Sequence, residues 1–172
     1  MKKLILSLAV IAIIFSASAQ KAKSKADAGN KVKFSVGADL GIPVGNYSTI
    51  ASFAYGGDLQ IDYMTSPTFA INLSAGYLGL SAKSGYSGIG GLIPILAGAR
   101  YWFSPKVYGS MQAGMSFSTQ SGGGSAFTYA PGVGFKVGES VDVLAKYQSA
   151  TKNSVDNSYV GVRVAYTFSS PK

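Results

Sequence analysis

Hydrophobic and polar residues alternate with a period of two in eight segments between Val32 and Phe168, and no segment there has the spacing of an amphipathic helix. Period-two alternation is the signature of a β-strand with two unlike faces. The segments are 9–12 residues long, close to the ~9–11 residues of a tilted membrane strand and longer than the ~5–6 of an ordinary strand. The predicted strands are residues 32–42, 54–64, 69–80, 93–103, 107–118, 126–137, 141–149 and 159–168.

The predicted connections alternate between short and long. Residues 65–68, 104–106 and 138–140 form short turns, whereas the other connections have 7–12 residues, at 43–53, 81–92, 119–125 and 150–158. Short turns at one end and longer loops at the other are typical of outer-membrane barrels. We therefore predict an all-β fold, an eight-stranded antiparallel up-and-down transmembrane β-barrel over residues 32–168. An even number of strands places both termini at the periplasmic, short-turn end.

One face of each predicted strand is apolar, and the other carries the charges. In the last strand, Val160, Val162 and Val164 share one face and Arg163 lies on the opposite face. A Lys or Arg that faces lipid costs about 2–4 kcal/mol at the bilayer midplane, so the apolar face is expected outside. Buried charges are costly unless paired, and Arg100 and Arg163 suit two-pronged pairing with carboxylates. We expect a paired lumen charge network of Lys33, Asp39, Asp58, Asp62, Arg100, Lys136, Asp142, Lys146 and Arg163.

Aromatic residues of the apolar face gather near the strand ends, with aliphatic residues between them. Two aromatic belts around an aliphatic band match the preference of amphipathic rings for membrane interfaces. The alternative is that aromatic residues merely favour strands, but this does not explain the aliphatic middle. The predicted periplasmic belt is Phe34, Tyr63, Phe69, Tyr101, Phe103, Phe135, Tyr166 and Phe168, and the outer belt is Tyr55, Tyr77, Phe117, Phe127, Tyr129 and Tyr147.

Some residues fit the pattern less well. Pro131 lies inside the sixth predicted strand and cannot donate a ladder hydrogen bond, which suggests a bulge or a later strand start. Pro94 suggests that the fourth strand begins at Ile95. The lumen is also not wholly polar, because four inward positions are apolar or aromatic: Leu78, Leu96, Trp102 and Leu144.

The N-terminal residues indicate export. Two lysines, a 12-residue apolar run and Ala17-Ser18-Ala19 predict a signal peptide over residues 1–19, cleaved before Gln20. An uncleaved membrane anchor is the alternative, although the apolar run is shorter than the ~20 residues of a spanning helix. Residues 20–31 form a basic flexible segment, for which we expect either a solvated leader or attraction to anionic headgroups. Residues 169–172 form a short tail.

The net charge of +8 does not indicate nucleic-acid binding. Residues 1–33 hold seven lysines and one aspartate, whereas residues 34–172 hold eight basic and six acidic residues. The predicted barrel is therefore nearly neutral and has no basic patch with interleaved aromatic residues.

Several motifs resemble the bacterial outer-membrane beta-barrel domain family. The run Gly41-Ile42-Pro43-Val44-Gly45-Asn46-Tyr47-Ser48, with Gly56-Gly57 and Asp62-Tyr63, is similar to the family's opening. Residues 93–103 are similar to its central strand and 159–168 to its closing strand, which ends on an aromatic residue. The resemblance covers about residues 32–168 and implies a small barrel of the OmpA and OmpX type. Two departures are the residues after Phe168, which put recognition by the barrel-assembly machinery in doubt, and the lack of an appended peptidoglycan-binding domain.

Catalytic chemistry is hard to build from this composition. The chain has no His and no Cys, which removes imidazole and thiolate ligands, Cys nucleophiles and the usual general base. Asp58 and Asp62 share a face, but four strand residues separate them by about 13 Å, too far for a glycosidase pair. The run Gly122-Gly123-Gly124 has no following Lys-Ser or Lys-Thr and resembles a flexible loop, not a P-loop. We therefore expect no enzyme and no cofactor.

Three functions remain. We expect an integral outer-membrane barrel, monomeric, with a lumen filled by side chains and a structural or surface-interaction role. A narrow pore for ions or small solutes is the second possibility, disfavoured because eight strands enclose little more than side chains. A soluble ligand-binding barrel is the third, and the apolar outer face argues against it. The expected partners are outer-membrane lipids and the barrel-assembly machinery, with no nucleic acid.

Overall fold

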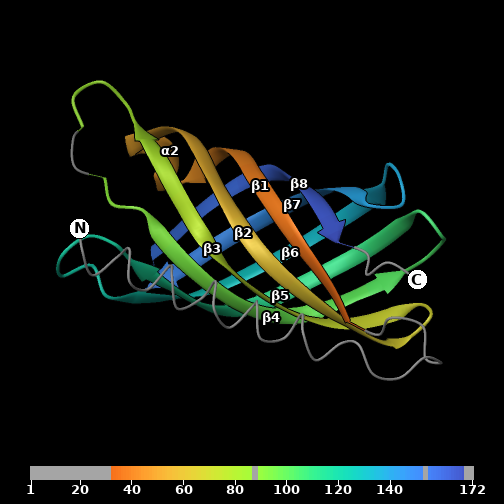
Figure 1. The fold of residues 1–172 in the computed structure, drawn as a ribbon. Helices are drawn as coiled ribbons and strands as arrows, with labels where there is room; N and C mark the ends of the chain where they lie inside the picture. Colours follow the sequence, from red (N-terminus) through yellow and green to blue (C-terminus); the bar gives the residue numbers. More distant parts are fainter. Residues whose placement is uncertain (1–31, 87–88, 153–154, 169–172) are drawn as a thin grey trace.

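The computed structural model describes residues 32–86, 89–152 and 155–168. They form a closed barrel of eight antiparallel strands, each hydrogen-bonded to its neighbours in sequence and β8 to β1 (Figure 1). The only helix in this part of the chain, α2, is a single turn over Tyr47–Ile50. The strands are β1 Val32–Gly45, β2 Ala51–Ser66, β3 Phe69–Ala82, β4 Leu92–Trp102, β5 Val107–Ser118, β6 Ser125–Lys136, β7 Val141–Lys152 and β8 Val155–Phe168.

This architecture confirms the predicted fold class and strand order. Burial alternates along the strands as the sequence pattern requires: in β1, Ser35, Gly37 and Asp39 are buried, whereas Val36 and Leu40 are exposed. The two ends of the barrel differ, as Figure 1 shows. We call the end with the connections 67–68, 103–106 and 137–140 the turn end. The opposite end, which carries α2 and residues 83–86, 89–91 and 119–124, is the loop end.

The strands reach further toward the loop end than predicted. The expected 11-residue loop at 43–53 shrinks to residues 46–50 between β1 and β2, and the expected loop at 150–158 mostly belongs to β7 and β8, which end and begin at Lys152 and Val155. The physical reason is that β1 and β8 continue to pair as far as Gly45 and Asn157. The ladder satisfies backbone groups there that the sequence pattern assigned to loops.

The prolines interrupt the ladder without shifting it. On the β7 side, β6 pairs through Tyr129 and resumes at Gly132 in the same register, so the bulge or late start predicted at Pro131 is wrong. Likewise β4 begins at Leu92, not at Ile95, and Pro94 lies opposite Ser116 of β5. Each proline lacks a donor toward one neighbour only, and the ladder on its other side holds the strand in place.

Three predicted segments lie outside the described residues: the signal peptide 1–19, the whole of the basic segment 20–31, and the tail 169–172. Among the described residues, no helix is both long and apolar enough to cross a membrane.

Candidate functional site

The lumen is crossed by a two-pronged ion pair between strands that are not neighbours. Arg163 of β8 donates from Nε to Oδ2 of Asp58 at 2.7 Å and from Nη2 to Oδ1 at 2.6 Å. The side chain passes over Gly37 of β1, where a Cβ would lie only 2.5 Å from Nε. Gly37 therefore provides the space through which Arg163 reaches β2, on the far side of the seam that closes the barrel.

Two more ion pairs lie in the lumen. Nζ of Lys146 on β7 is 2.7 Å from Oδ1 of Asp39 on β1, so this pair likewise spans one intervening strand, here β8. Nη1 of Arg100 on β4 is 3.4 Å from Oδ2 of Asp62 on β2, across β3. All four side chains are more than nine-tenths buried. In such surroundings each charge is tolerable only because its partner is held beside it.

The other three residues of the expected network are placed differently. Asp142 of β7 accepts a hydrogen bond from the hydroxyl of Tyr108 on β5, whose ring covers Gly134 of the intervening strand. The ammonium group of Lys136 lies over the Trp102 ring at 5.8 Å. Among the described residues, no ion pair joins Lys33 or Lys136 to a carboxylate within 4.0 Å. Six of the nine residues of the expected network thus form ion pairs, whereas Lys33, Lys136 and Asp142 form none within 4.0 Å in the described structure.

Uncharged polar side chains occupy much of the remaining lumen. Nε2 of Gln112 donates to Oδ1 of Asn72 at 2.9 Å and to Oγ of Ser74 at 3.1 Å. Other buried bonds join Gln60 to Asp62, Thr128 to Ser116 and Tyr159 to Gln148. The alternation of the sequence places all of these uncharged residues on the inward face of their strands. This inward position is the feature of the sequence that identifies them as lumen residues.

An apolar cluster lies inside the loop end, formed by the ends of predicted strands and by residues of the predicted loops. Leu78 and Leu80 of β3 pack there with Leu92 of β4, and Tyr47 and Ile50 of α2 cover the cluster. Burial raises the pKa of the Tyr47 hydroxyl above its usual value. The inward position of Leu78 agrees with the sequence analysis. The remaining members are Ala51, Ala54, Ala150 and Tyr159, with Ile89 and Ala126 packed against them.

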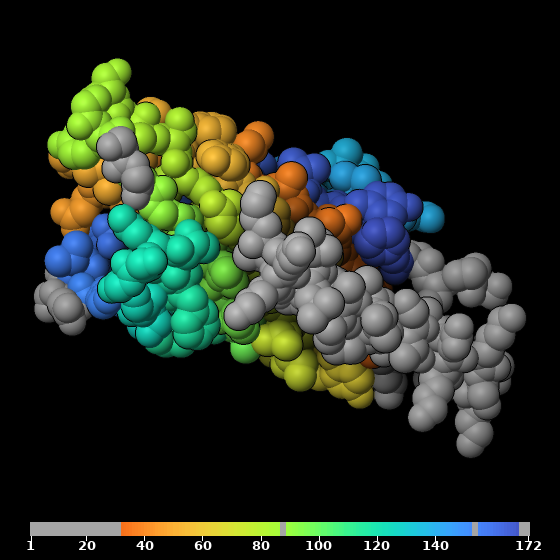
Figure 2. Space-filling model, turned by 60° about the vertical axis from the view of Figure 1, so that its left-hand side comes forward, coloured from red at the N-terminus to blue at the C-terminus, as the bar shows by residue number. Residues whose placement is uncertain are grey.

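The outward positions of β7 and β8 become polar at the same level. The Tyr147 hydroxyl donates to Oγ of Ser158 at 2.8 Å, and Ser158 donates to Oγ of Ser149 at 2.9 Å. One step further, Thr151 donates to the Asp156 carboxylate at 2.5 Å. Between the belts the wall is apolar outside and polar inside, whereas past the outer belt the interior is apolar and the outward positions of β7 and β8 are polar. We call the portion of the barrel past the outer belt, together with α2, the loop-end extension. Figure 2 shows its segments together on the side turned forward.

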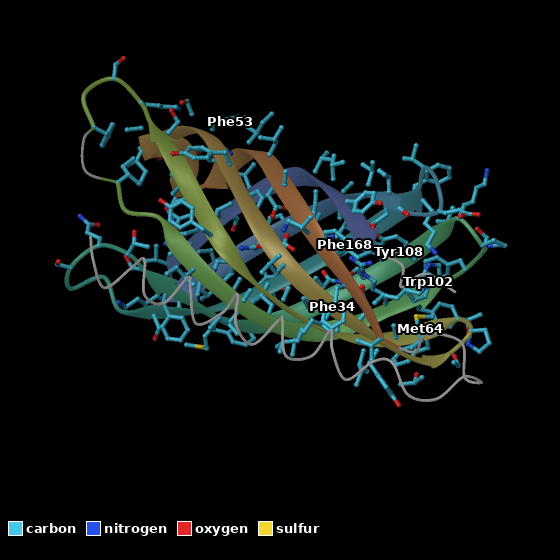
Figure 3. The ribbon with its side chains drawn as sticks, in the orientation of Figure 1. Phe34, Phe53, Met64, Trp102, Tyr108 and Phe168 are labelled. Carbon is cyan, nitrogen blue, oxygen red and sulfur yellow. The ribbon has the colours of Figure 1, made fainter. Side chains whose placement is uncertain are left out.

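The aromatic residues predicted for the belts have outward register positions, except Phe103, which follows β4 in the connection 103–106 and is exposed there. Along the turn end, Phe34 lies opposite Phe168 and Phe69 opposite Tyr101. Edge-to-face contacts join Tyr101 to Phe103 and Tyr166 to Phe168 at centroid distances of 5.4 and 5.2 Å. At the other level, Tyr129 and Tyr147 lie 6.1 Å apart. Trp102 points inward beside Tyr108 instead (Figure 3).

In the described structure, the inward side chains form ion pairs and hydrogen bonds with one another. Within residues 32–86, 89–152 and 155–168, no cluster of three or more His, Cys, Asp or Glu side chains is placed to hold a metal ion.

Comparison with protein families identifies the class. Residues 7–168 match the outer membrane protein beta-barrel domain. The chain belongs to this family. Membership, together with the closed barrel, makes the protein an outer-membrane β-barrel, as the sequence motifs suggested. No curated protein sequence matches the chain.

Solved structures with the same fold include small natural outer-membrane barrels and a designed transmembrane barrel. The attachment invasion locus protein Ail of Yersinia pestis has a TM-score of 0.56 at 14% identity, over 80% of this chain and 97% of Ail. The N-terminal barrel of Pseudomonas aeruginosa OprF has a TM-score of 0.52 at 16% identity, over 82% of this chain and 100% of OprF's. A de novo designed transmembrane barrel has a TM-score of 0.52 at 17% identity, over 84% and 100%. At these identities the similarity concerns the fold of the family barrel.

Proposed function

We propose that this family member is a sealed, non-catalytic outer-membrane barrel that presents its loop-end extension at the cell surface for structural or adhesive contacts. The chain is exported by a signal peptide cleaved before Gln20, is inserted by the barrel-assembly machinery and resides as a monomer among outer-membrane lipids. The belts contact the two interfaces, and the extension projects into water.

The reversal of polarity along the wall carries this proposal. Within the aliphatic band, outward Val162 and Val164 are exposed on the barrel while inward Arg163 is buried, as an apolar solvent requires. In the extension, Leu80 and Leu92 are buried inside and Asp156 is exposed outside, as water requires. The aliphatic band is thus built to face lipid, whereas the extension is built to face water. A barrel wholly within lipid, or wholly within water, would account for only one of these two regions.

The filled lumen favours a seal over a pore. The Arg163–Asp58 pair bridges β1 and the Lys146–Asp39 pair bridges β8 on the inner face of the wall, and the apolar cluster lies inside the loop end beyond them. Ions would have to break buried pairs and then pass an apolar plug, and each step is costly. The narrow pore is therefore the alternative that a conductance measurement tests.

Surface display can be tested with single cysteines, because the natural chain has none. Ser84, exposed at the loop end, and Lys106, exposed at the turn end, are matched positions. We expect S84C to react with a membrane-impermeant maleimide in intact cells, and K106C to react only after the outer membrane is permeabilised. The reverse labelling would contradict the proposed orientation.

Conductance is measured on the purified protein in planar bilayers, with a known porin as the positive control. We expect no stepwise current from the natural chain. Steady single-channel events that scale with the amount of folded protein would contradict the sealed barrel and favour the narrow pore.

A further inference from the structure

The turn-end mouth of the barrel contains a cavity that the proposed function does not use. The cavity has a volume of about 40 Å³, and a wider hollow of about 450 Å³ adjoins it between the turns 67–68 and 103–106. Both are lined by Lys33, Trp102 and Lys136. One water needs roughly 10–15 Å³ of such space, so the inner cavity accommodates about three waters or one small polyatomic ion. Figure 3 shows Trp102 and Tyr108 at this end.

A buried guanidinium group with unused donors lines the inner cavity. Arg100 is 4% exposed, its Nη1 pairs with Asp62, and its plane lies over the Tyr108 ring at 4.8 Å. Among the described residues, Nε and Nη2 of Arg100 have no hydrogen-bond partner, and neither has the indole Nε1 of Trp102. Three buried donors around one cavity require acceptors, and an anion with several oxygens supplies them together.

The charges at the mouth also favour an anion. Lys33 and Lys136 flank Trp102 without a carboxylate within ion-pair distance in the described structure. The acids that line the cavity are Asp62, Asp142 and Glu139. Asp62 is paired with Arg100, Asp142 accepts from Tyr108, and Glu139 is exposed in the turn 137–140. The two buried acids are thus already engaged, whereas both lysines and the three unused donors remain available.

We propose that the turn-end mouth binds one oxyanion of the phosphate or sulfate class, between the Arg100 guanidinium, the Trp102 indole and the ammonium groups of Lys33 and Lys136. Arginine and lysine form strong charge-assisted hydrogen bonds with such oxygens. The wider hollow opens toward the belt residue Phe103, so the oxyanion is either free in the periplasm or the phosphate of a lipid headgroup. This inference does not depend on the surface role of the loop end.

Trp102 is the only tryptophan of the chain, so its fluorescence reports on this site alone. The mature protein in a maltoside detergent, which carries no phosphate, is titrated with inorganic phosphate, and with chloride at matched ionic strength. We expect a saturable change with phosphate and none with chloride. The apparent dissociation constant should rise about three- to fivefold in K33Q and in K136Q, as expected for a partly exposed charge pair. K136R should retain binding.

K83Q is the matched control, because the Lys83 ammonium binds the Ser48 carbonyl oxygen at the loop end; its titration should match that of the natural chain. A response that chloride reproduces, or one unchanged in both K33Q and K136Q, overturns the proposal. The titration is then repeated in phospholipid nanodiscs. Loss of the response to free phosphate there assigns the oxyanion to a headgroup, and a retained response assigns it to the periplasm.

Discussion

Arg163 on the last strand donates hydrogen bonds to both carboxylate oxygens of Asp58 on the second strand, across the first strand, at 2.7 and 2.6 Å. The bond therefore spans the seam at which β8 meets β1. Arg163 is 2% exposed, and its Nη2 also lies 3.4 Å from Oγ of Ser35. The pair therefore links β8 to β2 across the closing seam, in addition to the backbone ladder between β8 and β1.

Breaking this pair should destabilise the barrel. R163A and D58A each leave an uncompensated buried charge, so each should lower the free energy of unfolding by about 3–5 kcal/mol. The double variant should cost about as much as the worse single variant, because it leaves neither charge alone. Urea unfolding in detergent micelles measures all three. Additive losses would show that Arg163 and Asp58 do not act as a pair.

Filling the space above Gly37 should weaken the same contact without removing a charge. In G37A the new methyl group lies 2.5 Å from Nε of Arg163, so the guanidinium must shift, at a cost of about 1–3 kcal/mol for overpacking. G138A is the control, because a Cβ there meets no atom within 4 Å. In the R163A background, G37A should cost much less. An equal cost in both backgrounds would place the strain elsewhere.

Two tyrosine-to-phenylalanine changes should differ sharply. Y108F removes the donor to the buried carboxylate of Asp142 and should cost about 1–3 kcal/mol, because that acceptor loses a partner. Y101F alters a ring that is 50% exposed on the outer face and should be nearly neutral. Both changes remove one oxygen atom, so the comparison isolates the inward hydrogen bond. Equal unfolding midpoints would contradict the importance of that bond.

The solvent boundary at the outer belt can be located with lysine substitutions. V162K places a charge on the outer face within the aliphatic band and should cost about 2–4 kcal/mol in a bilayer. S81K places the same charge on the outer face of β3, past Tyr77, where we expect water and a change within about 0.5 kcal/mol. The measurement is unfolding from liposomes. Similar costs at both positions would move the boundary beyond Ser81.

The sequence by itself determined the class of the fold. Alternation with a period of two assigns a face to each residue of a strand whatever the partner, so the placement of Val162 outward and Arg163 inward followed from parity alone. The length of the strands then indicated that they span a membrane. A sheet exposed to lipid must satisfy every backbone group by closing on itself, so these strands were expected to form a barrel. The family match and the closed sheet confirm that reasoning.

Only the tertiary structure decided which inward groups meet. Arg163 reaches Asp58, and not its cross-strand neighbour Asp39, because Gly37 leaves room above β1. Similarly, Asp142 meets Tyr108 across Gly134. Such contacts depend on the stagger between strands far apart in sequence, which local alternation does not encode. The loop-end extension was hidden for a related reason: Leu80, Leu92 and Ala150 indicate an interior only once the closed ladder brings three separate strands around them.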